Sequence, residues 1–180
     1  MSSKYKFRDH EKLYFITYTV INWLDVFIRN EYKKIMLDSW KYCVENKGME
    51  LFGWCIMTSH VHMIIGSHGD PMDAIMHDMK IHTSKELRKE ISDNTSESRK
   101  EWLPPMMKGH NKNFQFWQEG NHPIELFDLK IAHQKLDYIH RNPVVSGIVE
   151  NPEDYLYSSA RDYYGKKGLI ELTLLDPVLY

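Results

Sequence analysis

Two histidines stand two residues apart in an otherwise apolar stretch of the chain. Residues 57–65 read MTSHVHMII, a pattern typical of a buried β-strand. Side chains two apart on a strand point to the same face, so His60 and His62 are expected to project together while Val61 and Met63 face a core. Two neighbouring imidazoles are half of a metal site, but such pairs also occur on ordinary solvated sheet faces. The pair alone leaves both interpretations open.

A second candidate lies near the end of the chain, in the segment KLDYIHRNPV at 135–144. Tyr138 and Asn142 are four apart, so on a helix they share one face. If that face lies over the histidines, Asn142 could give an oxygen to a metal and Tyr138 could serve as a covalent nucleophile. The alternative is that Tyr138 packs the helix and Asn142 caps its end. His140 would face away from Tyr138, and we do not expect it to act as the base.

The elements that must position these residues can be read from periodicity. Strands are predicted at 14–20, 49–57 and 60–66, with a helix from Asn30 or Glu31 to Lys47 after the first strand. Gly48 is expected to end that helix in the left-handed conformation. Thr58 and Ser59 form a short turn, so the last two strands should make a hairpin. The two histidines would lie on its second strand.

The second half of the chain alternates in the same way. It is predicted to contain a helix from Pro71 to about Ile91, a mobile loop at 92–112 with a helical turn near 97–102, a strand region at 114–126 broken at 119–121, and a helix beginning at 127 or 128. Asp70 and Asp128 are expected to cap the two helices. The last helix should end at Arg141 or Asn142, because Pro143 disfavours helix in the residue before it.

One face of the predicted helix after Pro71 is rich in basic and hydroxyl side chains. We predict that this face contacts DNA through Lys80, Thr83, Ser84, Lys85, Arg88 and Lys89. The plainer interpretation is that these charges only solvate an exposed helix.

Composition sets the limits for these interpretations. The 180 residues are 42% hydrophobic and 27% charged, which suits one domain, with a core at about 10–150 and a C-terminal extension at about 151–180. No apolar run reaches the ~18 residues of a membrane span, and the N-terminus lacks an apolar signal core. Cys43 and Cys55 are the only cysteines, which suggests a reducing cytoplasm. A formal charge of −2 argues weakly against a non-specific nucleic-acid coat.

Taken together, four segments make the chain resemble the HUH single-tyrosine transposases, and most closely the REP-associated tyrosine transposases. The segments are MTSHVHMII, FWQEGNHP, YIHRNPVVSGIV and NPEDYLYSSARDYY, in an order and spacing that match the family over most of 10–165. The family usually shows Pro-Asn where this chain has Thr58 and Ser59. That departure affects the turn and leaves both histidines in place.

The resemblance implies a specific site. His60, His62 and Asn142 would ligate Mg²⁺ or Mn²⁺, and Tyr138 would be the nucleophile that cleaves single-stranded DNA and forms a 5′-phosphotyrosine. The resemblance further implies partners that are palindromic repeats folded as DNA hairpins. The order of the predicted elements, strand-helix-strand-strand-helix-strand, predicts a fold in the α+β class, with a ferredoxin-like central antiparallel sheet and packed helices. We find no P-loop and no dinucleotide fingerprint, in keeping with a reaction that conserves phosphodiester energy.

Two alternative functions are also compatible with the sequence. One is a hairpin-binding protein that no longer mobilises DNA, and the other is a metal-dependent phosphodiesterase acting on small substrates. The sequence fixes neither the DNA sequence recognised nor the oligomeric state. In a homodimer, Tyr138 could serve its own histidines or those of its partner, whereas a monomer would use its own.

Overall fold

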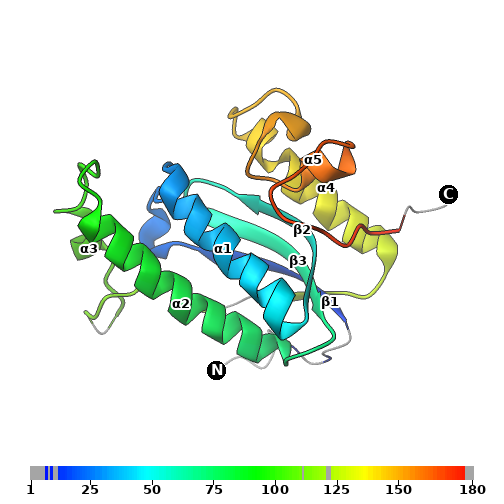
Figure 1. Ribbon diagram of the computed structural model, residues 1–180, viewed down its shortest axis with the longest axis horizontal. Coiled ribbons are helices and arrows are strands. Elements are labelled where there is room, and N and C mark those ends of the chain that lie inside the picture. Colours follow the sequence, from blue (N-terminus) through cyan, green and yellow to red (C-terminus); the bar gives the residue numbers. More distant parts are fainter. Residues whose placement is uncertain (1–6, 8, 10–11, 111, 121–122, 177–180) are drawn as a thin grey trace.

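The centre of the molecule is a four-stranded antiparallel sheet. A computed structural model describes residues 7, 9, 12–110, 112–120 and 123–176 (Figure 1). The strands are β1 (Leu13–Thr19), β2 (Met49–Ile56), β3 (His60–Ser67) and β4 (Ile124–Leu126). They lie in the order β2-β3-β1-β4. With helices after the first and third strands, this is the predicted ferredoxin-like arrangement.

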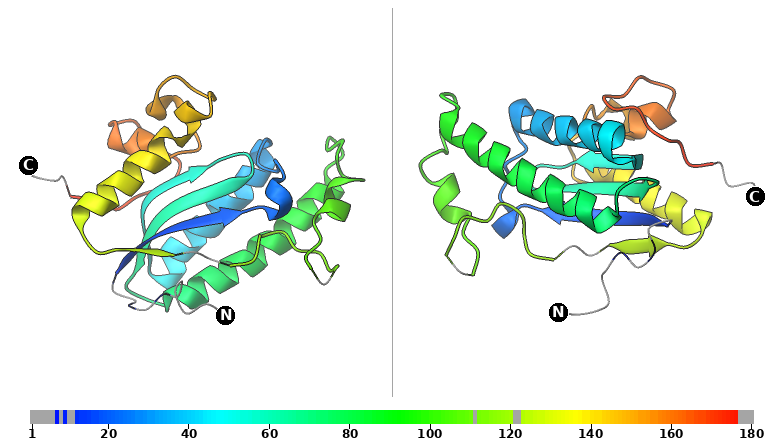
Figure 2. Two further views of the ribbon diagram at one scale, coloured as in Figure 1. Left: turned by 180° about the vertical axis from the view of Figure 1, so that it is seen from behind. Right: turned by 60° about the horizontal axis from the view of Figure 1, so that its bottom comes forward.

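Helices cover both faces of the sheet. One face lies under α1 (Asn30–Lys47) and α2 (Met72–Asp93), and α4 (Leu129–Val145) lies across the other, as Figures 1 and 2 show. The shorter elements are η1 (Ile21–Trp23), α3 (Leu103–Met106), η2 (Pro152–Asp154) and α5 (Ala160–Tyr163). None of the helices described is both long and apolar enough to pass through a lipid bilayer.

Strand β3 divides its side chains between two hydrophobic cores. Val61, Met63 and Ile65 belong to the larger core beneath α1 and α2. Ile64 belongs to the smaller core beneath α4. Because strand side chains alternate, His60 and His62 share the α4 face with Ile64. The predicted division between the histidines and their apolar neighbours is confirmed.

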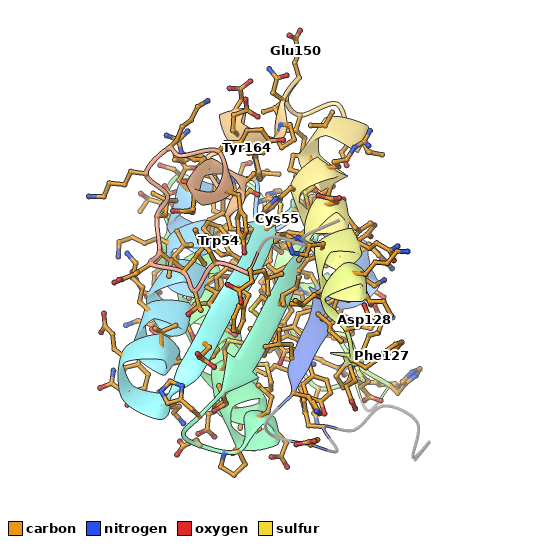
Figure 3. The ribbon with its side chains drawn as sticks, turned by 90° about the vertical axis from the view of Figure 1, so that its right-hand side faces the viewer. Trp54, Cys55, Phe127, Asp128, Glu150 and Tyr164 are labelled. Atoms are coloured by element: carbon orange, nitrogen blue, oxygen red, sulfur yellow. The ribbon has the colours of Figure 1, made fainter. Side chains whose placement is uncertain are left out.

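A glycine in β2 allows α4 to approach the sheet closely. A Cβ built on Gly53 would lie 2.6 Å from Leu136 Cδ1 in α4, so a larger residue here would require the Leu136 side chain to move. The strand pairing also shifts register between Leu51 and Gly53. Figure 3 shows α4 running alongside the strands, with its N-cap Asp128 labelled at one end. The close approach brings the polar face of this helix over β3.

Most predicted elements are confirmed to within one or two residues, and the larger differences lie at the end of α4 and in the strand region at 114–126. Gly48 has the expected left-handed φ of 69°, and Asp128 caps α4 by accepting a hydrogen bond from the Ile131 amide. The cap of α2 is Pro71 instead of Asp70, because the Pro71 carbonyl accepts the first helical bonds. Asp70 instead donates its backbone N–H to Lys47 O.

The prediction that Pro143 ends the last helix is wrong. Pro143 lies inside α4, which continues to Val145. The proline removes one helical donor, but Ser146 N still bonds to Asn142 O and Ile148 N to Pro143 O. Asn142 is therefore held within a continuous helix, so it is not the helix end-cap considered in the alternative interpretation.

The predicted strand at 114–126 is mostly not a strand. Only Ile124–Leu126 pairs with β1, while the earlier part contributes single bridges from Phe114 to Lys108 and from Trp117 to Val20. The helical turn expected near 97–102 forms as hydrogen-bonded turns over 98–102, including a bond from Leu103 N to Arg99 O, and continues into α3.

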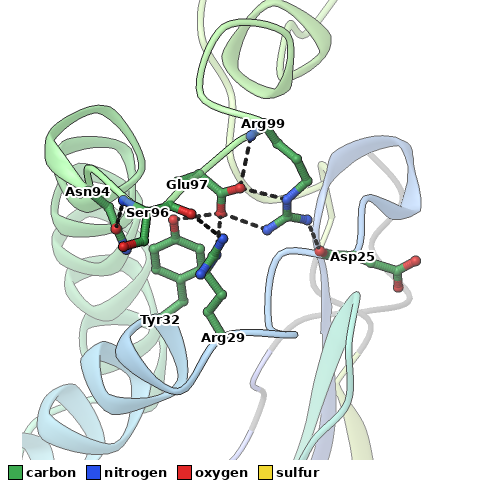
Figure 4. Close-up of polar contacts among 7 residues, drawn as sticks. All are labelled: Asp25, Arg29, Tyr32, Asn94, Ser96, Glu97 and Arg99. Carbon is green, nitrogen blue, oxygen red and sulfur yellow. Dashed lines mark hydrogen bonds and ion pairs between the residues drawn. The ribbon is translucent and has the colours of Figure 1, made fainter.

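The polar segment before α3 is anchored by a buried carboxylate, which the sequence did not reveal. Glu97 accepts hydrogen bonds from Arg29, Arg99 and Tyr32, and its side chain is fully buried (Figure 4). Arg99 also donates to the backbone oxygen of Asp25. The network thus ties this segment to the connection between η1 and α1.

Candidate active site

Two histidine rings and one tyrosine ring lie in a row on the α4 face of the sheet. The ring centroids of His60 and His62 are 4.8 Å apart, and those of His62 and Tyr138 are 5.2 Å apart. The residues come from β3 and α4, which are far apart in the sequence. The fold therefore brings the histidines of β3 and the tyrosine of α4 together, which the sequence analysis could only assume.

The His62 ring is held at both of its nitrogens. Thr17 Oγ1 on β1 lies 2.8 Å from His62 Nδ1, and Asn142 Nδ2 on α4 lies 3.2 Å from His62 Nε2. If Thr17 accepts a hydrogen bond from Nδ1–H, the Nε2 lone pair faces Asn142. Partners of this kind fix the tautomer and direction of a ligating imidazole. The Asn142 carboxamide also carries the oxygen that would bind a cation.

Tyr138 lies at the outer edge of this row. Its side chain is 51% exposed, so incoming DNA could reach the phenol. Lys135, one turn earlier on α4, places its ammonium 4.9 Å from the Phe15 ring centroid and 5.9 Å from the Tyr138 ring centroid. The Phe15 ring also stacks against His62 at 5.6 Å. A cation beside a phenol could stabilise the phenolate or a phosphate.

The environment keeps both imidazoles neutral. Burial lowers the pKa of His60, and burial together with His60 and Lys135 lowers the pKa of His62 to about 3. Metal ligation requires such neutral rings. His62 is only 3% exposed, so the sequence-based picture of two rings on a solvated sheet face is wrong for this residue. Helix α4 and Phe15 cover it, while His60 is half-buried.

Two imidazoles and one amide oxygen would give a divalent cation a neutral donor set, with the Asn142 carboxamide rotated so that Oδ1 replaces the Nδ2 that now faces His62 Nε2. Within the described residues, no group of three His, Cys, Asp or Glu side chains is arranged to hold a metal. Asn142 would therefore have to supply the third protein ligand. Because neutral ligands leave the charge of the cation uncompensated, the cation could attract and polarise a phosphate oxygen.

Two tyrosines of the C-terminal segment, which are alternatives to Tyr138 as nucleophile, and His140 on α4 have structural partners. The hydroxyls of Tyr155 and Tyr163 donate to the backbone oxygens of Ile56 and Phe52. His140 is buried with Nε2 2.9 Å from Ser159 Oγ, so it faces the C-terminal segment and, as expected, not Tyr138. The tyrosine best placed beside the histidines is therefore Tyr138.

Sequence reasoning missed Thr17 and Lys135. Lys135 could have been found, because it lies three residues before Tyr138 on a predicted helix. Thr17 could not, because its role depends on β1 pairing with β3 in the register that sets Thr17 opposite His62.

Helix α2, which carries the predicted DNA-binding face, lies on the opposite side of the sheet from α4 (Figure 2). Thr83 does not belong to it: the side chain is fully buried, donates to Met79 O and accepts from Trp117 Nε1. Lys80 is half-buried, with Nζ 4.4 Å from the Tyr18 ring centroid, and burial lowers its pKa to about 8. Neither residue is a free surface donor.

The rest of that face is accessible. Ser84, Lys85, Arg88 and Lys89 line a surface hollow together with Phe114. The Arg88 guanidinium lies 4.6 Å from the Phe114 ring centroid. The structure thus keeps four of the six predicted residues together on the surface, on a different face from Tyr138.

The fold resembles that of a solved DNA transposase. The structure of the REP-associated tyrosine transposase bound to a REP hairpin aligns over 100% of both chains, with a TM-score of 0.67 and 15% identity. A crystal structure of a proposed transposase from Deinococcus radiodurans R1 aligns over 77% of this chain and 95% of that chain, with a TM-score of 0.44 and 14% identity. The similarity to this second structure is too low to support a conclusion about the chain. A comparison with curated proteins gave no significant match.

The family follows from the sequence match. Residues 13–105, more than half of the chain, match the IS200-like transposase family. The chain belongs to this family, and the motif resemblance is confirmed at that level.

Proposed function

We propose that the protein cleaves and rejoins single-stranded DNA flanking a hairpin, using Tyr138 as its nucleophile and His60, His62 and Asn142 to hold Mg²⁺ or Mn²⁺. The observation that best supports this proposal is the contact between β3 and α4. Asn142 lies 3.2 Å from His62, and Tyr138 precedes it by one turn of the same helix. One rigid element thus carries both the nucleophile and a candidate ligand.

The reaction can be written with the groups of this chain. The Tyr138 phenol loses its proton to solvent water, and its oxygen attacks the scissile phosphorus. The bond from phosphorus to the 3′ oxygen breaks, that oxygen takes up a proton, and the DNA remains joined as a 5′-phosphotyrosine. Lys135 is placed to favour the phenolate or hold the phosphate. The bound cation would act as a Lewis acid on the phosphate.

The row of rings is assembled within a single chain. His60, His62, Asn142 and Tyr138 all come from the same protomer at contact distances. This supports a site in which each tyrosine serves its own histidines. A monomer would then suffice for cleavage, while a homodimer could still be needed to join two DNA ends.

Covalent trapping tests the proposal. Protein incubated with Mn²⁺ and a labelled hairpin carrying unpaired flanks should give a denaturation-resistant adduct. Tyr138→Phe should abolish this adduct and keep hairpin binding. Tyr164→Phe is the matched control, because this tyrosine in the C-terminal segment is exposed like Tyr138 and is not among the rings that contact His60 or His62. Binding without any adduct would favour a hairpin-binding protein, and an adduct that persists in Tyr138→Phe would assign another nucleophile.

A further inference from the structure

A tryptophan continues the row of rings at the end away from Tyr138. The ring centroid of Trp23 lies 5.5 Å from that of His60, in an edge-to-face arrangement. Its side chain is nevertheless 60% exposed. A large aromatic side chain that touches the candidate site and still faces solvent offers an open stacking surface. The row therefore runs from Trp23 through the two histidines to Tyr138.

The backbone that presents this ring is strained. Asn22 and Trp23 have φ values of 56° and 55°, in the left-handed region that bulky residues rarely occupy. The surrounding bonds hold them there: Ile21 N donates to Phe116 O, and Asn22 Nδ2 donates to Met106 O at 2.8 Å. Strain maintained in this way is concentrated at binding and catalytic sites.

A polar hollow adjoins the tryptophan. Besides Trp23, its lining includes Asn22, Gln115, Gln118, Lys108 and Glu119. Amide side chains carry both donors and acceptors, which suits the edge of a nucleobase. One lysine and one glutamate offset each other, and His110 also lines the hollow. With three amides and no cluster of cationic side chains among the described residues that line it, the hollow is better matched to the edge of a base than to a phosphate.

We propose that Trp23 stacks on an unpaired nucleobase close to the scissile phosphate, and that the adjoining hollow receives the edge of that base. The proposal rests on the proposed function, since it places the strand along the row from Tyr138 to Trp23. It assigns Trp23 to substrate binding, separate from the chemistry of bond cleavage. Stacking accepts every base, whereas the amides of the hollow would add preference.

Binding measurements test this without cleavage. The DNA is a hairpin with unpaired flanks, measured on the Tyr138→Phe protein in EDTA. Adding Trp23→Ala should weaken binding about 5- to 100-fold, the range that corresponds to one lost aromatic stack. Adding Trp23→Phe should retain most of the affinity. Trp102→Ala is the matched control, because Trp102 is 48% exposed and does not line the hollow.

An abasic scan locates the base. An abasic nucleotide at one flank position should weaken binding to the Trp23-containing protein and have little further effect on Trp23→Ala. The proposal is overturned if no single flank position shows this coupling, or if Trp23→Ala weakens binding equally to a hairpin with no flanks. Failure of covalent trapping would leave this result standing, because no step here depends on cleavage.

Glycine at position 23 separates binding from folding. Trp23→Gly should relieve the left-handed strain, so the melting temperature should stay the same or rise while DNA affinity falls. A tryptophan with a purely structural role would instead lower the melting temperature when removed. A fall in melting temperature with unchanged DNA affinity would overturn the proposal.

Discussion

Thr17 and His62 face each other across the pairing of β1 and β3, with Thr17 Oγ1 2.8 Å from His62 Nδ1. The opposite nitrogen of the same ring points to Asn142. A hydroxyl on one strand thus sets the direction in which an imidazole on the next strand offers its lone pair. A helix on the same face of the sheet supplies the third group.

We predict that Thr17→Val weakens Mn²⁺ binding about 10- to 100-fold, the usual effect of removing a partner that orients a ligating histidine. Valine keeps the shape of threonine and loses only the hydroxyl. The measurement is calorimetric titration with Mn²⁺. Thr19→Val is the control, because Thr19 lies on the same strand opposite His60 and bonds to neither histidine. Equal Mn²⁺ affinity in the two variants would show that Thr17 does not orient His62 for metal binding.

The two histidines should differ in their effect on stability. We expect His62→Ala to lower the free energy of unfolding by about 1–3 kcal/mol, because it empties a buried site and leaves Thr17 and Asn142 without their partner. His60→Ala should cost less, since His60 is half-buried. Urea unfolding followed by circular dichroism gives both values. A larger loss in His60→Ala would contradict the burial described for these rings.

Both variants should also lose metal-dependent cleavage if the metal site is as proposed. His77→Ala on the exposed face of α2 is a control for the loss of a histidine away from the site. Full cleavage by either active-site variant would rule that histidine out as an essential ligand.

The surface hollow on α2, which Lys85 helps to line, leads to a separate prediction about DNA binding. Lys85→Gln should flatten the slope of log affinity against log salt by roughly one unit if its ammonium contacts a phosphate. Lys41→Gln is the matched control, an exposed lysine on α1. Slopes that match in the two variants would mean that Lys85 only solvates its helix.

Glu97 should make stability sensitive to acid. Hydrogen bonding from Arg99, with further bonds from the Arg99 backbone and Tyr32, lowers the pKa of this carboxyl from 4.5 to about 2. A lowered folded-state pKa contributes stability that is complete above pH 4.5 and is lost as the pH falls towards 2. Glu97→Gln should therefore be less stable than the parent at pH 7, and the difference should shrink between pH 4.5 and 2.

Thermal unfolding across this pH range checks the prediction. Glu101→Gln is the control, because Glu101 is exposed and outside the Glu97 network. A difference between parent and Glu97→Gln that stays constant from pH 7 to pH 2 would show that the carboxylate charge does not stabilise the fold.

The sequence by itself determined the features that depend on the spacing of residues within a single strand or helix. Alternation along β3 placed His60 and His62 on one face, and the spacing of four put Tyr138 and Asn142 on one side of a helix. These relationships follow from the geometry of single elements. Several motifs in a fixed order also indicated the family, because their combination is far more specific than any one of them.

Only the tertiary structure decided burial and register. The same helical period that marks Lys85 as exposed could not show that Thr83 turns inward to Trp117, because the partner lies in a distant segment. The burial of His62 depends on α4 packing against the sheet, where Asn142 and Tyr138 meet the His62 ring. Trp23 meets His60 only because backbone bonds hold η1 in a conformation that no local preference favours. Contacts between distant segments arise when the whole chain packs, so local periodicity cannot predict them.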